Sequence, residues 1–247
     1  MSGSGAGYDQ STSTYSPDGR VFQIEYAQKA VGISGTALAL CCSDGVVFAT
    51  EKTLVSKMLV PESTKRVWQI DQGVSLGFAG ILPDARELVD HARSEAKTYR
   101  EYYDEDIPVR VLAERIAMFM HAYTQYWSVR PFGVTIFLGS WRNGNSELYT
   151  IDPSGTVTKF FGDAAGKGRQ SAKNEIEKVN FMSYSTKDAI LLAAKTIIKS
   201  HDDNDKDYEL EIVAISAESN GKHKEIPKDV LTQIEAQARE LIKNEQE

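Results

Sequence analysis

The sequence is poor in cysteine: its 247 residues include only two, Cys41 and Cys42, and these two are adjacent. Adjacent residues of a strand point to opposite faces, so this pair is badly placed to form a disulfide or to share a metal ion. The chain also lacks an Asn-X-Ser/Thr glycosylation site. These absences argue against a disulfide-stabilised secreted protein, and we expect an intracellular protein with reduced thiols.

An excess of basic residues is missing too. Lys and Arg number 28 against 35 Asp and Glu, which gives a formal net charge of −7. Nucleic-acid binding needs a basic surface, so we expect no nucleic-acid partner. No apolar run approaches the roughly 20 residues that cross a bilayer, and the Gly/Ser-rich start 1–7 lacks the apolar centre of a signal peptide. We therefore expect no membrane partner.

Motifs for metals and cofactors are absent as well. No histidine stands at ligand spacing from another His or a Cys; the four are His91, His121, His201 and His223. The glycine-rich segment 162–168 has the wrong spacing for a phosphate loop and lacks Ser or Thr after its Lys, which favours a strand-to-helix turn. The acidic segment 202–207 is followed by neither the Gly nor the Glu of a calcium loop, which favours a solvated loop. We expect no metal and no cofactor.

The most informative feature that is present lies between residues 8 and 31. Pro17-Asp18-Gly19 predicts a tight turn, because proline presets its own φ and glycine allows a positive φ. Apolar residues then recur at helical spacing over 20–31; they are Phe22, Tyr26, Ala27, Ala30 and Val31. A helix this short is marginal alone, so its apolar face indicates an assembly surface.

This segment resembles the N-terminal signature of proteasome α subunits. It matches Tyr-Asp at the start, Ser-Pro-Asp-Gly-Arg in the turn and Gln-Ile-Glu-Tyr-Ala in the helix, in order and without gaps. Further blocks at 46–52, 123–133, 151–155 and 166–170 resemble the family in the same order. The stretch 169–178 is similar to one eukaryotic type among these subunits in particular, as is the residue Gln10.

Periodicity predicts the remaining helices and strands. Strands are expected at 36–42, 46–50, 66–71, 74–79, 134–140, 147–151, 156–161, 209–216 and 223–226. Helices are expected from 83, from 108, over 168–179, from 185 and from 227. We expect the first four strands to form one sheet and the strands of 134–161 to form a second set. The buried helical stripes are expected to include Tyr103, Trp127, Val230 and Leu241.

Two antiparallel sheets packed face to face, with helices on both outer sides, would bury these stripes. The predicted fold class is therefore α/β in the α+β sense, a four-layer αββα sandwich with an extra N-terminal helix. The resemblance implies the same architecture, the fold of N-terminal-nucleophile hydrolases. No linker divides the chain, so we expect one domain over 1–247, with a flexible tail at 1–7, a helix at 20–31 and a core at 34–247.

The resemblance raises the question of catalysis, because the β subunits of the family use an N-terminal threonine as nucleophile. Aligning Gly45 and the strand after it with the β-subunit pattern puts Gly35 at the nucleophile, Glu51 at the orienting Asp and Arg66 at the Lys. Arginine cannot give up its proton. We therefore expect no catalytic residue in this chain.

One alternative is an autoprocessed N-terminal threonine hydrolase, a catalytic proteasome-type peptidase. Cleavage before Thr36 would create a free threonine amine. The register opposes this alternative, since Lys52 and Trp68 would then stand where the Asp and the Lys belong.

The resemblance also implies three groups of functional residues. A gate cluster, which holds α-subunit tails in the open arrangement, comprises Tyr8, Asp9, Pro17 and Tyr26. A pocket between neighbouring α subunits, where activators insert a C-terminal carboxylate, comprises Arg66, Lys65 and Gly19. A ring-assembly surface on the N-terminal helix comprises Phe22, Glu25 and Tyr26.

The function that follows from the resemblance is that of a non-catalytic structural subunit in the seven-membered outer ring of the 20S proteasome. Its tail would gate the admission of substrate in ubiquitin-dependent and ubiquitin-independent protein degradation. Its expected partners are other α subunits, β-ring subunits, regulatory-particle ATPases and other activators. Its expected location is the cytoplasm and the nucleus.

Overall fold

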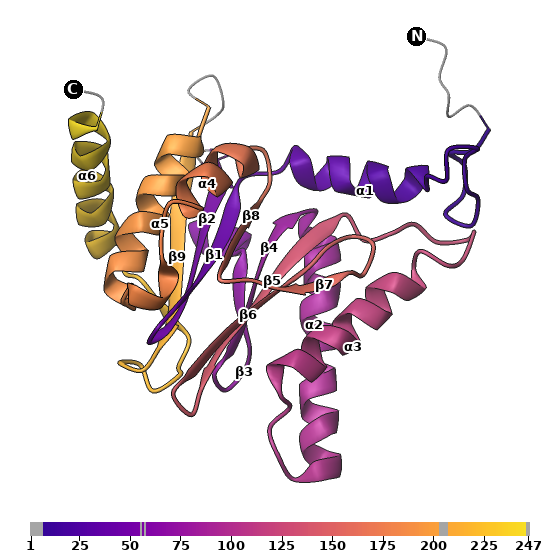
Figure 1. Ribbon diagram of the computed structural model, residues 1–247, viewed down its shortest axis with the longest axis horizontal. Coiled ribbons are helices and arrows are strands. Elements are labelled where there is room, and N and C mark those ends of the chain that lie inside the picture. The colour runs from indigo at the N-terminus through magenta and orange to yellow at the C-terminus, as the bar shows by residue number, and fades with distance from the viewer. Residues whose placement is uncertain (1–6, 55, 57, 203–206, 246–247) are drawn as a thin grey trace.

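The structure, a computed structural model, describes residues 7–54, 56, 58–202 and 207–245. Figure 1 shows the arrangement of its helices and strands. The helices are α1 Phe22–Gly32, α2 Leu82–Tyr103, α3 Val109–Ala122, α4 Arg169–Ile176, α5 Thr186–Ser200 and α6 Lys228–Asn244. The strands are β1 Ala37–Cys42, β2 Gly45–Thr53, β3 Val67–Asp71, β4 Val74–Gly80, β5 Val134–Arg142, β6 Asn145–Ile151, β7 Val157–Lys159, β8 Gly162–Ala165, β9 Tyr208–Ser216 and β10 Lys224–Glu225. Short 3₁₀ turns lie at Pro61–Thr64 and Phe181–Ser183.

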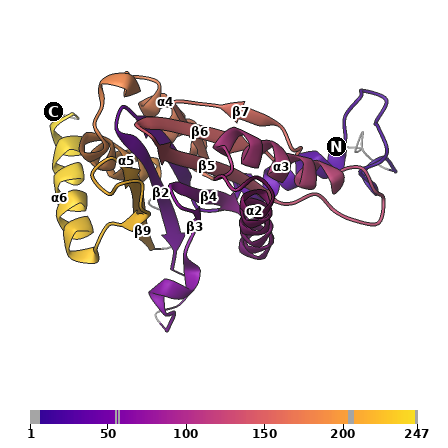
Figure 2. The same ribbon diagram turned by 90° about the horizontal axis from the view of Figure 1, so that it is seen from below.

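The strands form two sheets, each with antiparallel pairing throughout. The first has the order β10-β9-β2-β1-β8 and the second the order β3-β4-β5-β6-β7. Helices α4, α5 and α6 cover the first sheet, and α2 and α3 cover the second, so that four layers follow one another across the molecule (Figure 2). The predicted αββα sandwich is confirmed.

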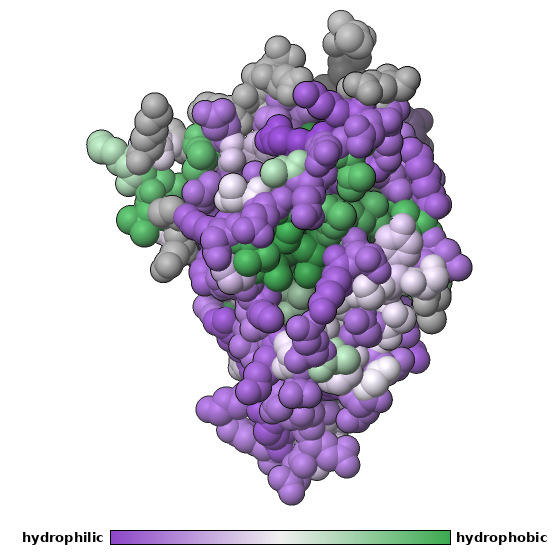
Figure 3. All heavy atoms as spheres, turned by 90° about the vertical axis from the view of Figure 1, so that its left-hand side faces the viewer, coloured by the Kyte–Doolittle hydropathy of each residue, from purple (hydrophilic) through white to green (hydrophobic). Residues whose placement is uncertain are grey.

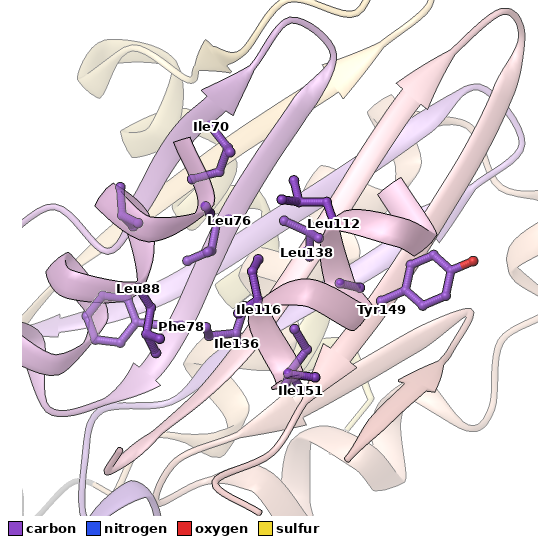
Figure 4. Packing of buried hydrophobic residues seen from close by; sticks show 14 of the residues in the cluster. Ile70, Leu76, Phe78, Leu88, Leu112, Ile116, Ile136, Leu138, Tyr149 and Ile151 are labelled. Carbon is purple, nitrogen blue, oxygen red and sulfur yellow. The ribbon is translucent and has the colours of Figure 1, made fainter. Parts of the chain in front are cut away.

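Three apolar clusters occupy the three interfaces between these layers. One joins α2 and α3 to the second sheet; Figure 4 shows Leu112 and Ile116 of α3 directed at Leu138 of β5. Another joins the first sheet to α4, α5 and α6, and the third lies between the sheets around Phe48. Burial on both faces explains why the central strands are nearly continuous apolar runs.

Helix α1 lies outside these layers and crosses one end of the two sheets (Figure 1). It contributes Val31 to the cluster between the sheets, and Phe22 and Ala27 are buried as well. A Cβ atom added to Gly133 would lie 3.5 Å from the Cβ atom of Ala30, so the helix is in van der Waals contact with this backbone. One face of the short helix is therefore held by the core, as its marginal length requires.

The prediction that the first four strands share one sheet is wrong. β1 and β2 belong to the first sheet, and β3 and β4 belong to the second. The free edge of β2 pairs with β9, whereas β4 pairs with β5. Alternation of apolar residues defines which face is buried, but it carries no information about the neighbouring strand.

Two predicted helical stripes end earlier than expected. Helix α3 ends at Ala122 rather than reaching Trp127, which is 80% exposed. The hydroxyl of Thr124 donates to the carbonyl of His121 at 2.7 Å, and such a local bond competes with helix continuation. Tyr103, at the end of α2, is also exposed, because Asp104 adopts a left-handed conformation that stops the helix.

Helix α6 also buries less than its pattern predicts. Leu231 and Ala238 are buried, but Val230 and Leu241 are 39% and 41% exposed. Figure 3 faces this side of the molecule and shows apolar atoms surrounded by hydrophilic ones. The face of α6 that packs on the core is therefore narrower than the apolar stripe of its sequence.

Two loop predictions are wrong in part or lie outside the described residues. The segment 162–168 is a strand-to-helix turn only in its last part, since Gly162–Ala165 pairs with β1 as strand β8. The acidic loop 202–207 falls mostly on residues 203–206, and the tail 1–7 mostly on 1–6; both stretches lie outside the described residues.

The cysteines follow their prediction: Cys41 faces the other sheet and Cys42 faces the helices.

Candidate functional site: a blocked nucleophile position

The three residues aligned with catalytic positions meet in space. Gly35 precedes β1, Glu51 lies on β2 and Arg66 directly precedes β3. The Nη1 atom of Arg66 donates to the carbonyl oxygen of Gly35 at 3.2 Å. A Cβ atom on Gly35 would lie 2.5 Å from the carbonyl oxygen of Glu51. This position therefore has no room for a side chain, and hence none for a nucleophile.

Thr36 is equally unsuited to act as a nucleophile in the intact chain. Its nitrogen is a peptide N–H that donates to Oε2 of Glu51 at 3.1 Å. Its hydroxyl accepts a hydrogen bond from the backbone N–H of Gly168 at 3.0 Å, and the residue is 1% exposed. The geometry of this threonine is that of a structural residue at the start of a strand.

Buried charges surround the blocked position. Burial lowers the pKa of the Arg66 guanidinium, and the carboxylates of Glu51 and Glu211 oppose this shift. Burial likewise raises the pKa of Glu211, although its Oε2 accepts from the backbone N–H of Arg66 at 2.9 Å. The Arg66 guanidinium lies 5.5 Å from the ring centre of Phe78. The cluster joins residues of, or next to, the four strands β1, β2, β3 and β9.

One member of this cluster was missed from the sequence. Nδ1 of His201, at the end of α5, lies 2.9 Å from Oε1 of Glu51, and its ring lies against Tyr208. Glu51 thus accepts from both Thr36 and His201. The partners are 150 residues apart along the chain, and no local pattern signals such a contact.

The N-terminal turn forms as predicted. The backbone N–H of Gly19 donates to the carbonyl of Ser16 at 2.9 Å, and Gly19 has a φ of 74°. The backbone N–H of Ser16 in turn donates to the carbonyl of Arg20. This closed turn orients the first residues of α1.

The predicted gate cluster is assembled only in part. The hydroxyl of Tyr26 donates to Oδ2 of Asp9 at 3.4 Å, and the Gln23 amide donates to the carbonyl of Asp9. Tyr8 and Pro17 are exposed. The structure therefore joins Asp9 to Tyr26 and leaves the other two at the surface.

The residues of the predicted assembly surface differ in their freedom to bind a partner. Phe22 is buried against the chain's own core, whereas Tyr26 is 38% exposed. Glu25 accepts from Nε of Arg20 at 2.6 Å, and hydrogen bonding to Arg20 lowers the pKa of the Glu25 carboxyl. Of the three, Tyr26 offers the most surface.

The residues of the predicted activator pocket do not meet within the chain. Lys65 reaches Oε1 of Glu225 at 2.6 Å, while Arg66 turns inward to Gly35. Gly19 lies at the other end of α1, an 11-residue helix that is about 16 Å long (Figure 1). These groups can only converge if two copies of the fold stand side by side.

Sequence reasoning also missed a charged anchor behind the N-terminal segment. Asp84 accepts from Nη1 and Nη2 of Arg130 at 2.6 and 2.8 Å, and from the backbone N–H of Gly133 at 2.9 Å. The segment that Arg130 fixes includes Tyr126, whose carbonyl accepts from the hydroxyl of Thr12. The only local signal is Arg-Pro-Phe-Gly after a helix, which does not reveal the partner.

Replacing Asp84 by asparagine is expected to lower the free energy of unfolding at pH 7 by about 1–2 kcal/mol. Burial disfavours the charged carboxyl, but the hydrogen bonds from Arg130 and Gly133 outweigh it and hold the pKa of Asp84 below its ordinary value. The lowered pKa contributes stability above about pH 3.9 that disappears as the pH falls through the folded value. Urea unfolding of both proteins at several pH values measures the gap, which should close in acid.

The matched control is Asp90→Asn on the same helix, where the carboxylate is 77% exposed and 3.7 Å from Arg93. This change should cost under about 0.5 kcal/mol at every pH. An equal effect of both substitutions would contradict the anchoring role of Asp84.

Two other kinds of site have no candidate in the described part of the chain. No helix there is long and apolar enough to cross a membrane. Nor do three or more His, Cys, Asp or Glu side chains of residues 7–54, 56, 58–202 and 207–245 gather into a metal site.

These features define a class of protein: the N-terminal-nucleophile fold with its nucleophile position filled by an internal glycine. The model of the proteasome subunit family matches residues 32–215, and the model of the N-terminal signature of A-type proteasome subunits matches residues 8–30. The chain belongs to the proteasome subunit family, and its signature makes it one of the α-type subunits of the 20S core particle.

Known proteasome subunits are similar to this chain over nearly their full length. The α type-3 proteasome subunit of Acanthamoeba castellanii is 47% identical over 244 residues, which cover 98% of this chain and 97% of the relative. The α type-3 proteasome subunit of Arabidopsis thaliana is 43% identical over 98% of each chain. A probable α type-7 proteasome subunit of Schizosaccharomyces pombe is 41% identical over 100% of this chain and 98% of the relative.

These comparisons decide between the two functional predictions. Alpha-type subunits are non-catalytic members of the particle. The alternative prediction, an autoprocessed threonine hydrolase, is therefore wrong. The predicted likeness to the α type-3 subunits is confirmed. As a member of the proteasome family, the protein assembles with other proteasome subunits.

Proposed function

We propose that this subunit occupies the seven-membered outer ring, where it contacts two α neighbours and a β ring and limits the admission of unfolded polypeptide. The blocked position at Gly35 is the observation that carries this proposal. The chain reaches Gly35 directly from α1, so the extension that denies the fold a nucleophile also supplies a helix outside the core. Closed rings need two different faces on each subunit, and α1 supplies part of one.

Exposed aromatic side chains support two contact surfaces. Tyr15, Tyr126 and Trp127 are 71%, 63% and 80% exposed near the start of α1, and such residues dominate binding energy in protein interfaces. At the far tip of α2, Tyr102 is 81% exposed beside Tyr103. We assign the first group to an α neighbour and the second to the stacked β ring.

A native mass spectrum of the particle purified from its own cells tests this arrangement. The expected result is one copy of this chain per outer ring of seven, with the mass of the N-terminus intact. A chain that begins at Thr36, or one found only as a monomer, would overturn the proposal.

We further propose that the tail 1–7 obstructs the axial pore and that the Asp9–Tyr26 contact directs it. Deleting residues 2–7 in the assembled particle is expected to raise its hydrolysis of small peptides, since a shorter tail cannot reach the pore. Tyr26→Phe, which removes only the hydroxyl that bonds Asp9, should change this rate in the full-length chain but not in the deletion. Identical rates for wild type and deletion would contradict a gating tail.

The activator pocket is proposed to form between Lys65 and Arg66 of this chain and the Gly19 turn of a neighbour. Lys65 supports this better than Arg66, because its ammonium lies at the surface while the guanidinium faces Gly35. Regulatory-particle ATPases and other activators would dock there by a terminal carboxylate. We propose the cytoplasm and nucleus as locations, and a single domain over 1–247 whose core spans 34–247.

A further inference from the structure

A cavity of about 480 Å³ opens where the two sheets separate beneath α1. Figure 1 shows the elements that surround it: α1 above, β6 and β7 on one side, and β8 and α4 on the other. Threonines of the second sheet line one wall; they are Thr135, Thr150 and Thr158. The first residues of α4 line the opposite rim. The cavity lies apart from the blocked nucleophile position and is lined by none of its charged groups.

The carboxylates that line this cavity are already engaged. Asp163 accepts from Nζ of Lys173 at 2.7 Å and from the backbone N–H of Ala164. Asp152 accepts from Ser154 and Thr156 within its own turn. Lys173 thus balances the charge of Asp163. The bonds to Asp152 come from neutral groups and leave its charge in place, so Arg169 is the cation of the lining that has to offset it.

Two kinds of donor lie at the rim. Arg169, the first residue of α4, lines the cavity and makes no ion pair with any described residue. The first N–H groups of a helix lack partners within it and favour a negative charge. In α4 the N–H of Arg169 donates to the carbonyl of Gly166 at 3.3 Å, so the donors of this helix start are the N–H groups that follow it. A guanidinium and a helix start therefore belong to the same part of the lining.

The wall of the cavity supplies an independent sign of a missing acceptor. Thr150 is 7% exposed, and its hydroxyl has no hydrogen-bond partner among the residues that the structure describes. A buried hydroxyl without a partner is costly. The residue stands opposite Thr158 on β7, so both side chains share the face that lines the cavity.

We propose that this cavity binds an oxyanion, a phosphate or carboxylate group, through Arg169, the start of α4 and the hydroxyl of Thr150. Arg169 would hold the group by a charge-assisted, bidentate contact. The site goes beyond the structural role of the subunit, and it exists in the chain whether or not it is assembled.

Equilibrium dialysis of the full-length chain against radiolabelled inorganic phosphate tests the site, with amide shifts of Thr150 and α4 as the locator. We expect saturable binding that Arg169→Gln weakens by about tenfold or more, the usual worth of a hydrogen bond to a charged group. Thr150→Val should weaken binding by a few-fold without lowering the unfolding midpoint of the phosphate-free chain, since it removes an unpaired hydroxyl. Arg239→Gln, on the exposed side of α6, should leave binding unchanged.

The assembled particle distinguishes the two sources of the oxyanion. Phosphate that binds the particle as it binds the free chain identifies a dissolved phosphate as the ligand. Phosphate that binds only the free chain identifies a carboxylate from a neighbouring chain as the group that occupies the cavity. Absence of saturable binding at millimolar phosphate, or equal binding by Arg169→Gln and wild type, would overturn the proposal and leave water alone in the cavity.

Discussion

Phe48→Ala is expected to lower the free energy of unfolding by about 3–5 kcal/mol, the range found for aromatic truncations in cores. Phe48 lies on β2, is fully buried and packs between the two sheets. Its ring lies against two glycines of the opposite sheet: Cβ atoms at Gly77 and Gly139 would stand 3.0 and 2.7 Å from it. Backbone fixed in a sheet cannot move in to fill the space, so the cost should fall in the upper part of the range.

Urea unfolding followed by tryptophan fluorescence measures this loss, and the unfolding temperature should fall by roughly 6–20 °C. Phe161→Ala is the matched control, because the same atoms are removed from a side chain that is 61% exposed. It should cost under about 1 kcal/mol. A loss at Phe48 no larger than at Phe161 would mean that the sheets close over the cavity.

The layered architecture could be predicted because buried faces produce a periodic pattern of apolar residues in the sequence. Strands such as β1 and β4 are apolar on both faces, and helices such as α3 carry one stripe, so the order of elements already implies four layers. Local chemistry was equally readable. The predicted cap of α5 forms, with Ser185 accepting from the N–H of Asp188 at 3.3 Å and Asp188 accepting in return.

The pairing of strands was not open to prediction in the same way. β2 lies beside β9, whose residues come some 160 positions later in the chain. Each strand is apolar on both faces, so many partners would satisfy the same pattern. Long loops such as the one between β2 and β3 close at little entropic cost, and chain proximity is then a poor guide to the sheet.

The candidate site, too, could be predicted only in part. The motif alignment placed Gly35, Glu51 and Arg66 together, and the hydrogen bond from Arg66 to Gly35 bears this out. The residues that complete the cluster, His201 and Glu211, come from the end of α5 and from β9 and belong to no motif. Contacts between side chains far apart in sequence follow from topology, which periodicity leaves open.

Glu51→Ala is expected to lower the free energy of unfolding by about 3 kcal/mol, because it removes the carboxylate beside a buried cation. Glu51 is 6% exposed and accepts from Thr36 and His201, and its charge stabilises that of Arg66. Without it, the Thr36 N–H and the His201 ring lose this acceptor, and among the described residues Glu211 remains as a counter-charge of the guanidinium. Glu51→Gln keeps an acceptor but removes the charge, so its loss should be intermediate.

Glu209→Ala on the neighbouring strand is the matched control, since that carboxylate is partly exposed and lies 3.5 Å from Lys52 and 3.7 Å from Lys228. It should cost at most about 1 kcal/mol. Because Glu51 also fixes the backbone next to Gly35, Glu51→Ala should impair incorporation into the particle at a temperature where the isolated variant is still folded. Equal stability of the Glu51 and Glu209 variants would show that Arg66 is paired elsewhere. Glu51 would then have no part in holding α1 to the core.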